Sequence, residues 1–433
     1  MLIRRFVTAV LRIVARVFFS RVAVVGAPTI PADTPVIFAA NHPNGLIDPL
    51  VLLCFAPRPI SFLAKAPLFR MPLVGWFARA FGSIPVYRQQ DGEPTSRNQE
   101  TFALARSVLS SGGAIAIFPE GTTHSEPRLL ELKTGAARIA LGCSMETAVN
   151  IVPVGLFYTA KESFRSSVVI HFGQPVAALS EPLNANGEPP RASVERLTEE
   201  VERALRELTL EADSQAALAL VSRASRIFSA GRGELVSELE LQQRFVSGYA
   251  SLRTSDPVRL AALESRVERF AAELGEARLE PEELVPPTLA GSVRTVSTLI
   301  LLLPLALAGG LLHLPAYRLI GALVHRFCKE EEMAATMKTV GGLFAYPVTW
   351  LLLGALGWWL VAPWVGVCVL LFVPLLGYVA LRVFEQLDDV IGRARALTWR
   401  VARVQAYERL LAEQRSIRQE IVTLGEEMQF PPM

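Results

Sequence analysis

The stretch PVIFAANHPNGLIDPLVLLCF, residues 35–55, decides the fold. Its first six residues are apolar, as in a strand that is buried on both faces. Pro, Asn and Gly then predict a loop. Asp48 followed by Pro49 is a favourable helix start, because Asp accepts hydrogen bonds from the first turn and proline fits there. The stretch therefore predicts a strand, a loop and a helix, with His42 in the loop directly after the strand.

The same alternation continues through residues 35–175. Further apolar runs predict strands at 60–65, 83–88, 114–120, 151–158 and 168–173. The segments between the strands predict helices at 48–55, 71–81, 97–112 and 131–143. Such an alternation is typical of an α/β fold with a mostly parallel, covered sheet and flanking helices. Residues 176–190, rich in Pro, Asn and Gly, predict an exit loop.

The N-terminal segment, residues 1–25, is basic and apolar and contains no acidic residue. Arg5, Arg12 and Arg16 fall on one helical face, and apolar side chains take the remainder. This pattern predicts an amphipathic helix in a membrane interface, with the arginines reaching anionic headgroups. The alternative is the same helix packed on its own domain.

The remaining chain divides by composition. The α/β domain is expected over residues 26–180, and a charged helical region of ordinary surface helices over 191–285. A transmembrane region is expected over 293–384, and a helical tail over 385–433. The four cysteines, Cys54, Cys143, Cys328 and Cys368, lie in apolar surroundings without paired or metal-like spacing, which indicates buried, inert thiols in a reducing compartment.

Two long stretches of the transmembrane region carry no charged side chain. Residues 339–381 are long enough for two crossings of about 20 residues each, with Trp358, Trp359 and Pro363-Trp364 at the turn. Residues 295–317 either cross once or dip into the membrane and return. The number of membrane spans is therefore expected to be between two and four. An even number is favoured, because the basic N-terminus and the Arg-rich tail both prefer the cytoplasm.

Three loops that follow predicted strands carry groups capable of chemistry. His42 beside Asp48 is typical of a general base. The Asp48 carboxylate would fix the tautomer of the imidazole and stabilise the imidazolium that forms when it takes up a proton. Glu120-Gly121-Thr122 offers a carboxylate, a permissive backbone and a hydroxyl in one turn, which suit polyol hydroxyls or a phosphate edge. Arg88 can bind a phosphate with two N–H groups. A structural reading, in which Asp48 is only a helix cap, explains that residue alone equally well.

These motifs resemble the glycerophospholipid acyltransferases, a family that includes lysophosphatidic acid and glycerol-3-phosphate acyltransferases. The resemblance covers about residues 20–180 and includes the order of the motifs. His42 and Asp48 match the family's His/Asp motif, Gly82 through Arg88 its second block, Phe118 through Thr122 its third, and residues 151–156 its fourth. The common form has four residues between His and Asp, whereas this chain has five, Pro43 to Ile47. This departure leaves the identity of the acceptor open.

The resemblance implies a catalytic mechanism. His42, aligned by Asp48, removes a proton from the acceptor hydroxyl, which attacks the thioester of acyl-CoA or acyl carrier protein. Arg88 binds the acceptor phosphate, and Glu120, Gly121 and Thr122 position the glycerol part. No cofactor beyond the acyl co-substrate and no metal are expected, because the spacing of His124 from His42 and Asp48 does not favour a metal site. Lys65 and Lys133 either assist phosphate binding or are solvated surface residues.

The expected partners are membrane lipids and the acyl donor. The formal net charge of +2 does not suggest nucleic acid, and the sequence does not indicate an oligomeric state. The expected location is a membrane, specifically a bacterial inner membrane with the catalytic domain in the cytoplasm. Three alternatives stay open: an acyltransferase for another lysolipid or an amino-lipid, a non-catalytic membrane scaffold of the same fold, and a metal-dependent lipid hydrolase.

Overall fold

The computed structural model describes residues 2–30, 34–143, 148–161, 163–179, 181–230, 235–284, 289–327 and 331–428. The chain forms two compact units. The first comprises Met1–Ser214 with the short segments Leu235–Leu239 and Glu330–Thr336, and the second comprises Gln215–Glu234, Glu240–Lys329 and Met337–Met433.

The first unit is built on one sheet of eight strands in the order β1-β7-β6-β2-β5-β3-β4, with β8 beside β6. The strands are β1 (Arg21–Val25), β2 (Val36–Ala40), β3 (Ser61–Lys65), β4 (Ile84–Val86), β5 (Ala114–Ile117), β6 (Val149–Tyr158), β7 (Ser167–Phe172) and β8 (Val176–Ala178). Neighbours are parallel, except where β6 pairs with β7 and with β8. The mostly parallel sheet predicted from the sequence is therefore confirmed.

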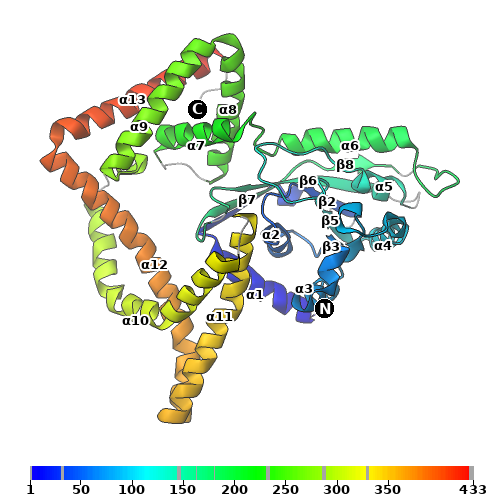
Figure 1. The fold of residues 1–433 in the computed structure, drawn as a ribbon, viewed down its shortest axis with the longest axis horizontal. Coiled ribbons are helices and arrows are strands. Elements are labelled where there is room, and N and C mark those ends of the chain that lie inside the picture. The colour runs from blue at the N-terminus through cyan, green and yellow to red at the C-terminus, as the bar shows by residue number, and fades with distance from the viewer. Residues whose placement is uncertain are drawn as a thin grey trace. The chain divides into compact units, whose positions relative to one another are not determined.

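Helices cover the sheet on both faces (Figure 1). They are α1 (Leu2–Phe18), α2 (Ile47–Phe55), α3 (Pro72–Ala80), α4 (Asn98–Ser110), α5 (Gly135–Leu141) and α6 (Arg191–Arg206). One core joins the sheet to α4, α5 and α6 through residues such as Leu109 and Ile139. The other joins it to α1 and α2 through Phe18 and Val51. Burial on both faces explains why the strands are continuous apolar runs and do not alternate.

Three predicted boundaries differ from the structure. The N-terminal helix ends at Phe18, and residues 21–25, expected as its continuation, form β1 along β7. The predicted exit loop contains β8, whose backbone pairs with β6. Helix α6, expected in the charged helical region, packs its apolar stripe on the sheet. The three differences have one cause. Each segment pairs with or packs on a part of the sheet that is distant in the chain, and local composition does not predict such contacts.

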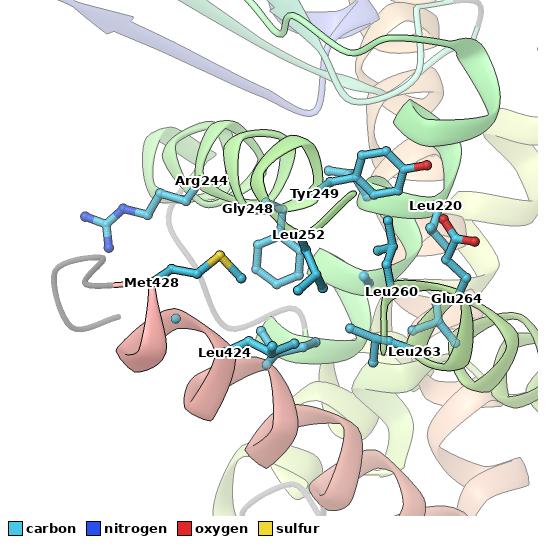
Figure 2. Close-up of a pocket in the computed structure, with 16 residues that line it drawn as sticks. Leu220, Arg244, Gly248, Tyr249, Leu252, Leu260, Leu263, Glu264, Leu424 and Met428 are labelled. Carbon is cyan, nitrogen blue, oxygen red and sulfur yellow. The ribbon is translucent and has the colours of Figure 1, made fainter. Parts of the chain in front are cut away.

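The second unit contains a helical bundle of α7 (Gln215–Ser229), α8 (Leu235–Ser255) from Glu240 onward, α9 (Pro257–Ala277) and α13 (Val404–Glu427). Its core joins Phe228, Phe270 and Ile417. On its surface, Arg266 of α9 forms ion pairs with Glu413 and Glu420 of α13. The bundle also holds an apolar pocket of about 90 Å³, lined by α7, α8, α9 and α13 (Figure 2).

In the described part of the chain, three helices are long and apolar enough to cross a membrane: α10 (Leu289–Phe327), α11 (Glu331–Leu360) and α12 (Pro363–Ala402). Helix α9 precedes all three and α13 follows them, yet the two share one core. The shared core is compatible with the even number of crossings that the sequence favoured, and the number of crossings stays a prediction. Figure 1 shows α10 bent along its length, and it contains Pro304 and Pro315, residues that kink helices. The expectation that this segment either crosses once or dips into the membrane and returns also stays a prediction.

Candidate active site

The candidate site lies at the carboxyl ends of neighbouring strands. The loop after β2 carries His42, the loop after β5 carries Glu120, and β6 ends at Tyr158. Strand β2 is parallel to β5 on one side and to β6 on the other, so these three ends meet at one sheet edge. Ligands of open α/β sheets bind at this edge.

His42 and Asp48 form the hydrogen-bonded pair that the sequence predicted. The Nδ1 atom of His42 lies 2.8 Å from Oδ2 of Asp48, whose side chain is buried. Because a carboxylate can only accept, the imidazole proton is on Nδ1, and the lone pair of Nε2 is the basic position. The ring of Phe118 stacks on the imidazole with centroids 4.0 Å apart. The pair therefore has the geometry of a general base whose ring orientation is fixed.

The structure excludes the reading of Asp48 as a helix cap. Helix α2 begins at Ile47 with Leu46 at the cap position, and Asp48 lies within the first turn. Its Oδ2 atom accepts the backbone N–H of Asn44 at 2.7 Å in addition to His42. The carboxylate thus faces back toward the His42 loop and stabilises it.

Tyr158 is a member of the site that sequence reasoning missed. Its hydroxyl donates to Oδ1 of Asp48 at 2.6 Å. Burial, followed by the charge and hydrogen bond of Asp48, raises the pKa of Tyr158 well above its ordinary value, so the hydroxyl stays protonated as a donor. The available signal was its position at the end of a buried strand, where a polar group points toward the loops.

Two asparagines fasten the His42 loop to the end of β6. The side chain of Asn41 pairs with both backbone groups of Leu156, at 2.7 and 3.1 Å. The amide of Asn44 donates to the carbonyl of Lys161 at 2.7 Å. These bonds explain how a loop with Pro and Gly holds the side chain of His42 in one position.

Glu120 is buried, and both of its oxygens accept hydrogen bonds from the protein. Oε1 accepts the backbone N–H of His42 at 2.8 Å. Oε2 accepts the backbone N–H of Leu130 at 3.0 Å and a short hydrogen bond from Nε2 of His124. The prediction that Glu120 positions the acceptor stays a prediction, and the structure shows a second role, because this carboxylate holds the backbone of His42.

Gly121 and Thr122 continue the turn after Glu120. Gly121 has φ +74°, a conformation that favours glycine, and a Cβ there would lie 3.5 Å from the stem of Lys133. Thr122 is exposed, and its hydroxyl donates to the carbonyl of Thr123 at 3.3 Å. The roles predicted for Gly121 and Thr122 in substrate binding stay predictions.

Arg88 reaches the same turn, and its guanidinium is occupied by protein acceptors. Nε and Nη2 donate to the two oxygens of Asp91 at 2.7 and 2.8 Å, and Nη1 donates to the carbonyl of Gly121. The hydrogen bond from Arg88 lowers the pKa of Asp91, and the nearby charge of Lys65 acts in the same direction. Sequence reasoning missed Asp91, and the predicted role of Arg88 in phosphate binding stays a prediction.

In the described ranges of the first unit, burial keeps the cysteine thiols protonated and therefore poorly reactive. Burial raises the pKa of Cys54 to about 12 and that of Cys143 to about 11. Cys328 lies outside the described residues. Across the described part of the chain, no group of three His, Cys, Asp or Glu side chains is placed to hold a metal ion.

Comparison with known proteins identifies the domain that carries this site. Residues 21–156 match the family model of the Acyltransferase domain. The chain carries an acyltransferase domain. The match agrees with the acyltransferase resemblance of the motifs, and the matched residues include His42, Asp48, Arg88 and Glu120.

Three relatives show how far the similarity extends. Glycerol-3-phosphate O-acyltransferase 1 of Saccharomyces cerevisiae is 24% identical over 78% of this chain and 57% of its own length. The chloroplastic 1-acyl-sn-glycerol-3-phosphate acyltransferase LPAT1 of Arabidopsis thaliana is 29% identical over 33% of this chain and 38% of its own. The lyso-ornithine lipid O-acyltransferase of Brucella abortus is 32% identical over 34% and 53%. The chain thus spans about half the length of these relatives, or less.

Proposed function

We propose that this protein transfers a fatty acyl group to a hydroxyl of glycerol-3-phosphate or of 1-acylglycerol-3-phosphate, in the synthesis of membrane glycerolipids. The donor is acyl-CoA or acyl carrier protein. The observation that carries the proposal is the hydrogen bond between His42 and the buried Asp48, at the sheet edge of an acyltransferase domain. The names of the yeast and plant relatives support the two acceptors.

The geometry suits direct transfer without an acyl-enzyme. Nε2 of His42 takes the proton of the acceptor hydroxyl while the oxygen attacks the thioester carbonyl. Asp48 stabilises the imidazolium that forms, and Tyr158 and Asn44 hold Asp48 in place by donating to it. When the C–S bond breaks, the imidazolium returns its proton to the sulfur, and the products are the ester and the thiol.

An acceptor phosphate at Arg88 would share its guanidinium with acceptors of the protein. Three of the five N–H groups of an arginine are here directed at Asp91 and Gly121, so a phosphate would bind through the second N–H of Nη1 and of Nη2 or replace one of these acceptors. Lys65 lies close enough to Asp91 to influence it electrostatically and supplies a second positive charge in this region. We assign the phosphate of the acceptor to this region, with Arg88 as its principal ligand.

The N-terminal helix supports action at a membrane surface. In α1, Phe6, Val10 and Ile13 are exposed, at 71%, 38% and 64%. The opposite face packs on α2, and Arg12, which the sequence directed to lipid headgroups, donates to the carbonyl of Cys54. One face of α1 therefore packs on its own domain, and the other face is apolar and exposed, as in a helix of a membrane interface. We propose that its apolar face enters the membrane interface, with the catalytic domain on the cytoplasmic face of a bacterial inner membrane.

One specific observation favours a second acceptor class. The Brucella relative is named as acting on a lyso-ornithine lipid, an acceptor other than a glycerol phosphate. In this chain Arg88 is already neutralised by Asp91, as it would remain if the acceptor carried no phosphate. The alternative keeps the His42 chemistry and changes only the acceptor.

A direct assay tests the proposal. The full chain, purified in detergent, is given glycerol-3-phosphate, 1-acylglycerol-3-phosphate or a lyso-amino-lipid, each with acyl-CoA and with acyl carrier protein as the donor. We expect ester formation with a glycerol phosphate and its loss in the His42→Ala variant. Circular dichroism checks that the variant is folded. Ester formation at an unchanged rate in a folded His42→Ala variant would overturn the mechanism, and transfer to the amino-lipid alone would select the alternative.

A further inference from the structure

We propose that His124 is a positioning residue for the general base, acting through Glu120. This inference rests on the proposed function. In this role His124 does not touch the reacting atoms. It fixes the carboxylate of Glu120, which in turn holds the backbone of His42.

The segment from Phe118 to His124 holds His42 in three ways. The ring of Phe118 stacks on the imidazole. Oε1 of Glu120 accepts the backbone N–H of His42 at 2.8 Å. The backbone N–H of His124 donates to the carbonyl of His42 at 3.4 Å. Ring, N–H and carbonyl of the base are therefore all held by one loop.

Glu120 can perform this task only if its own position is fixed. Its side chain is completely buried, and among the described residues His124 is the side chain that donates a hydrogen bond to it. Its remaining donors are the backbone N–H groups of His42 and Leu130. A buried carboxylate that loses a donor must find water or move, because an unsatisfied buried charge is costly. Movement of Glu120 would shift the backbone of His42.

The second ring nitrogen of His124 determines which way its proton points. Nδ1 accepts the backbone N–H of Glu126 at 3.2 Å, so this nitrogen carries a lone pair. The proton therefore lies on Nε2 and is donated to Oε2 of Glu120. The loop after β5 thus orients the imidazole, and the imidazole orients Glu120.

Two amide variants separate this role from a general effect on folding. A glutamine amide places its N–H₂ near the position of Nε2, whereas the shorter asparagine amide lies near Nδ1 and does not reach Glu120. We expect His124→Gln to keep most of the activity. We expect His124→Asn to lose roughly 10- to 100-fold in kcat with KM for both substrates nearly unchanged, the effect of a small misplacement of the base. Glu126→Gln, which removes an exposed charge from the same loop and keeps the backbone donor, is the matched control.

The outcomes are distinguishable from failure of the proposed function. If the unmodified chain transfers no acyl group to any acceptor, the function itself is wrong. If the unmodified chain is active and both amide variants have the same kcat as Glu126→Gln, His124 has no positioning role. An increase in KM for the acceptor in His124→Asn, with kcat unchanged, would also overturn the inference, since it would make His124 part of the acceptor site.

Discussion

The ion pair between Arg88 and Asp91 predicts that removing a charged side chain from the site lowers KM for the acceptor. In the proposed reaction an acceptor phosphate and the carboxylate of Asp91 compete for the positive charge of the same guanidinium. We expect Asp91→Asn to lower KM for the phosphorylated acceptor, although it removes a charged side chain from the site. Asparagine retains an oxygen that accepts one hydrogen bond from Arg88, so the arginine stays in place while the competing charge is lost.

The magnitude follows from the geometry of the pair. Two charge-assisted hydrogen bonds of 2.7 and 2.8 Å join side chains that are 23% and 16% exposed, so solvent weakens the pair only in part. A hydrogen bond to a charged group contributes about 1.5–3 kcal/mol, and asparagine keeps part of this. A loss of about 1–2 kcal/mol of competition corresponds to a roughly 5- to 30-fold lower KM, at about 1.4 kcal/mol per tenfold.

Steady-state kinetics at fixed acyl donor measures this effect. Inhibition by inorganic phosphate should strengthen in parallel in Asp91→Asn, because the same site binds it. Glu93→Gln is the matched control, since Glu93 pairs with the largely exposed Arg70. An unchanged KM in Asp91→Asn would refute the competition, and a higher KM would show that Asp91 prepares Arg88 for binding.

Three further predictions follow from the structure. Tyr158→Phe removes a donor from the buried Asp48 and should lower the free energy of unfolding by about 1.5–3 kcal/mol, measured by denaturation in detergent; an unchanged midpoint contradicts the bond. Cys54 and Cys143 should resist alkylation at pH 8 in the folded protein, because raised pKa values of about 12 and about 11 leave almost no thiolate until the pH approaches those values; equal labelling of folded and denatured protein would show otherwise. In sealed vesicles, an impermeant maleimide should label Glu276→Cys and Glu426→Cys from one side and Val361→Cys from the other; labelling of Glu276→Cys and Glu426→Cys from opposite sides excludes an even number of crossings.

The sequence predicted those parts of the site that local pattern determines. Apolar runs followed by polar loops gave the strands and brought His42, Arg88 and Glu120 to strand ends. It missed Tyr158 and Asp91, because each acts through a partner that spacing does not reveal. Tyr158 is distant from Asp48 in the chain and meets it only because β6 lies beside β2. Asp91 is close to Arg88 in the chain, but an acidic residue in a short turn is usually solvated.

The local geometry also explains how the His/Asp motif tolerates one additional residue. The extra residue lies in a loop where Gly45 adopts φ +37°. The carbonyl of Asn44 accepts the N–H groups of both Ile47 and Asp48, at 2.9 and 3.2 Å, so α2 begins before the aspartate. The first turn of the helix then directs Asp48 back toward His42, where the backbone N–H of Asn44 and the hydroxyl of Tyr158 hold it. The distance along the chain changes, but the hydrogen bond to Nδ1 is kept. What the motif requires here is the hydrogen bond between the Asp48 carboxylate and the His42 imidazole. A gap of five residues is therefore no argument against general-base chemistry.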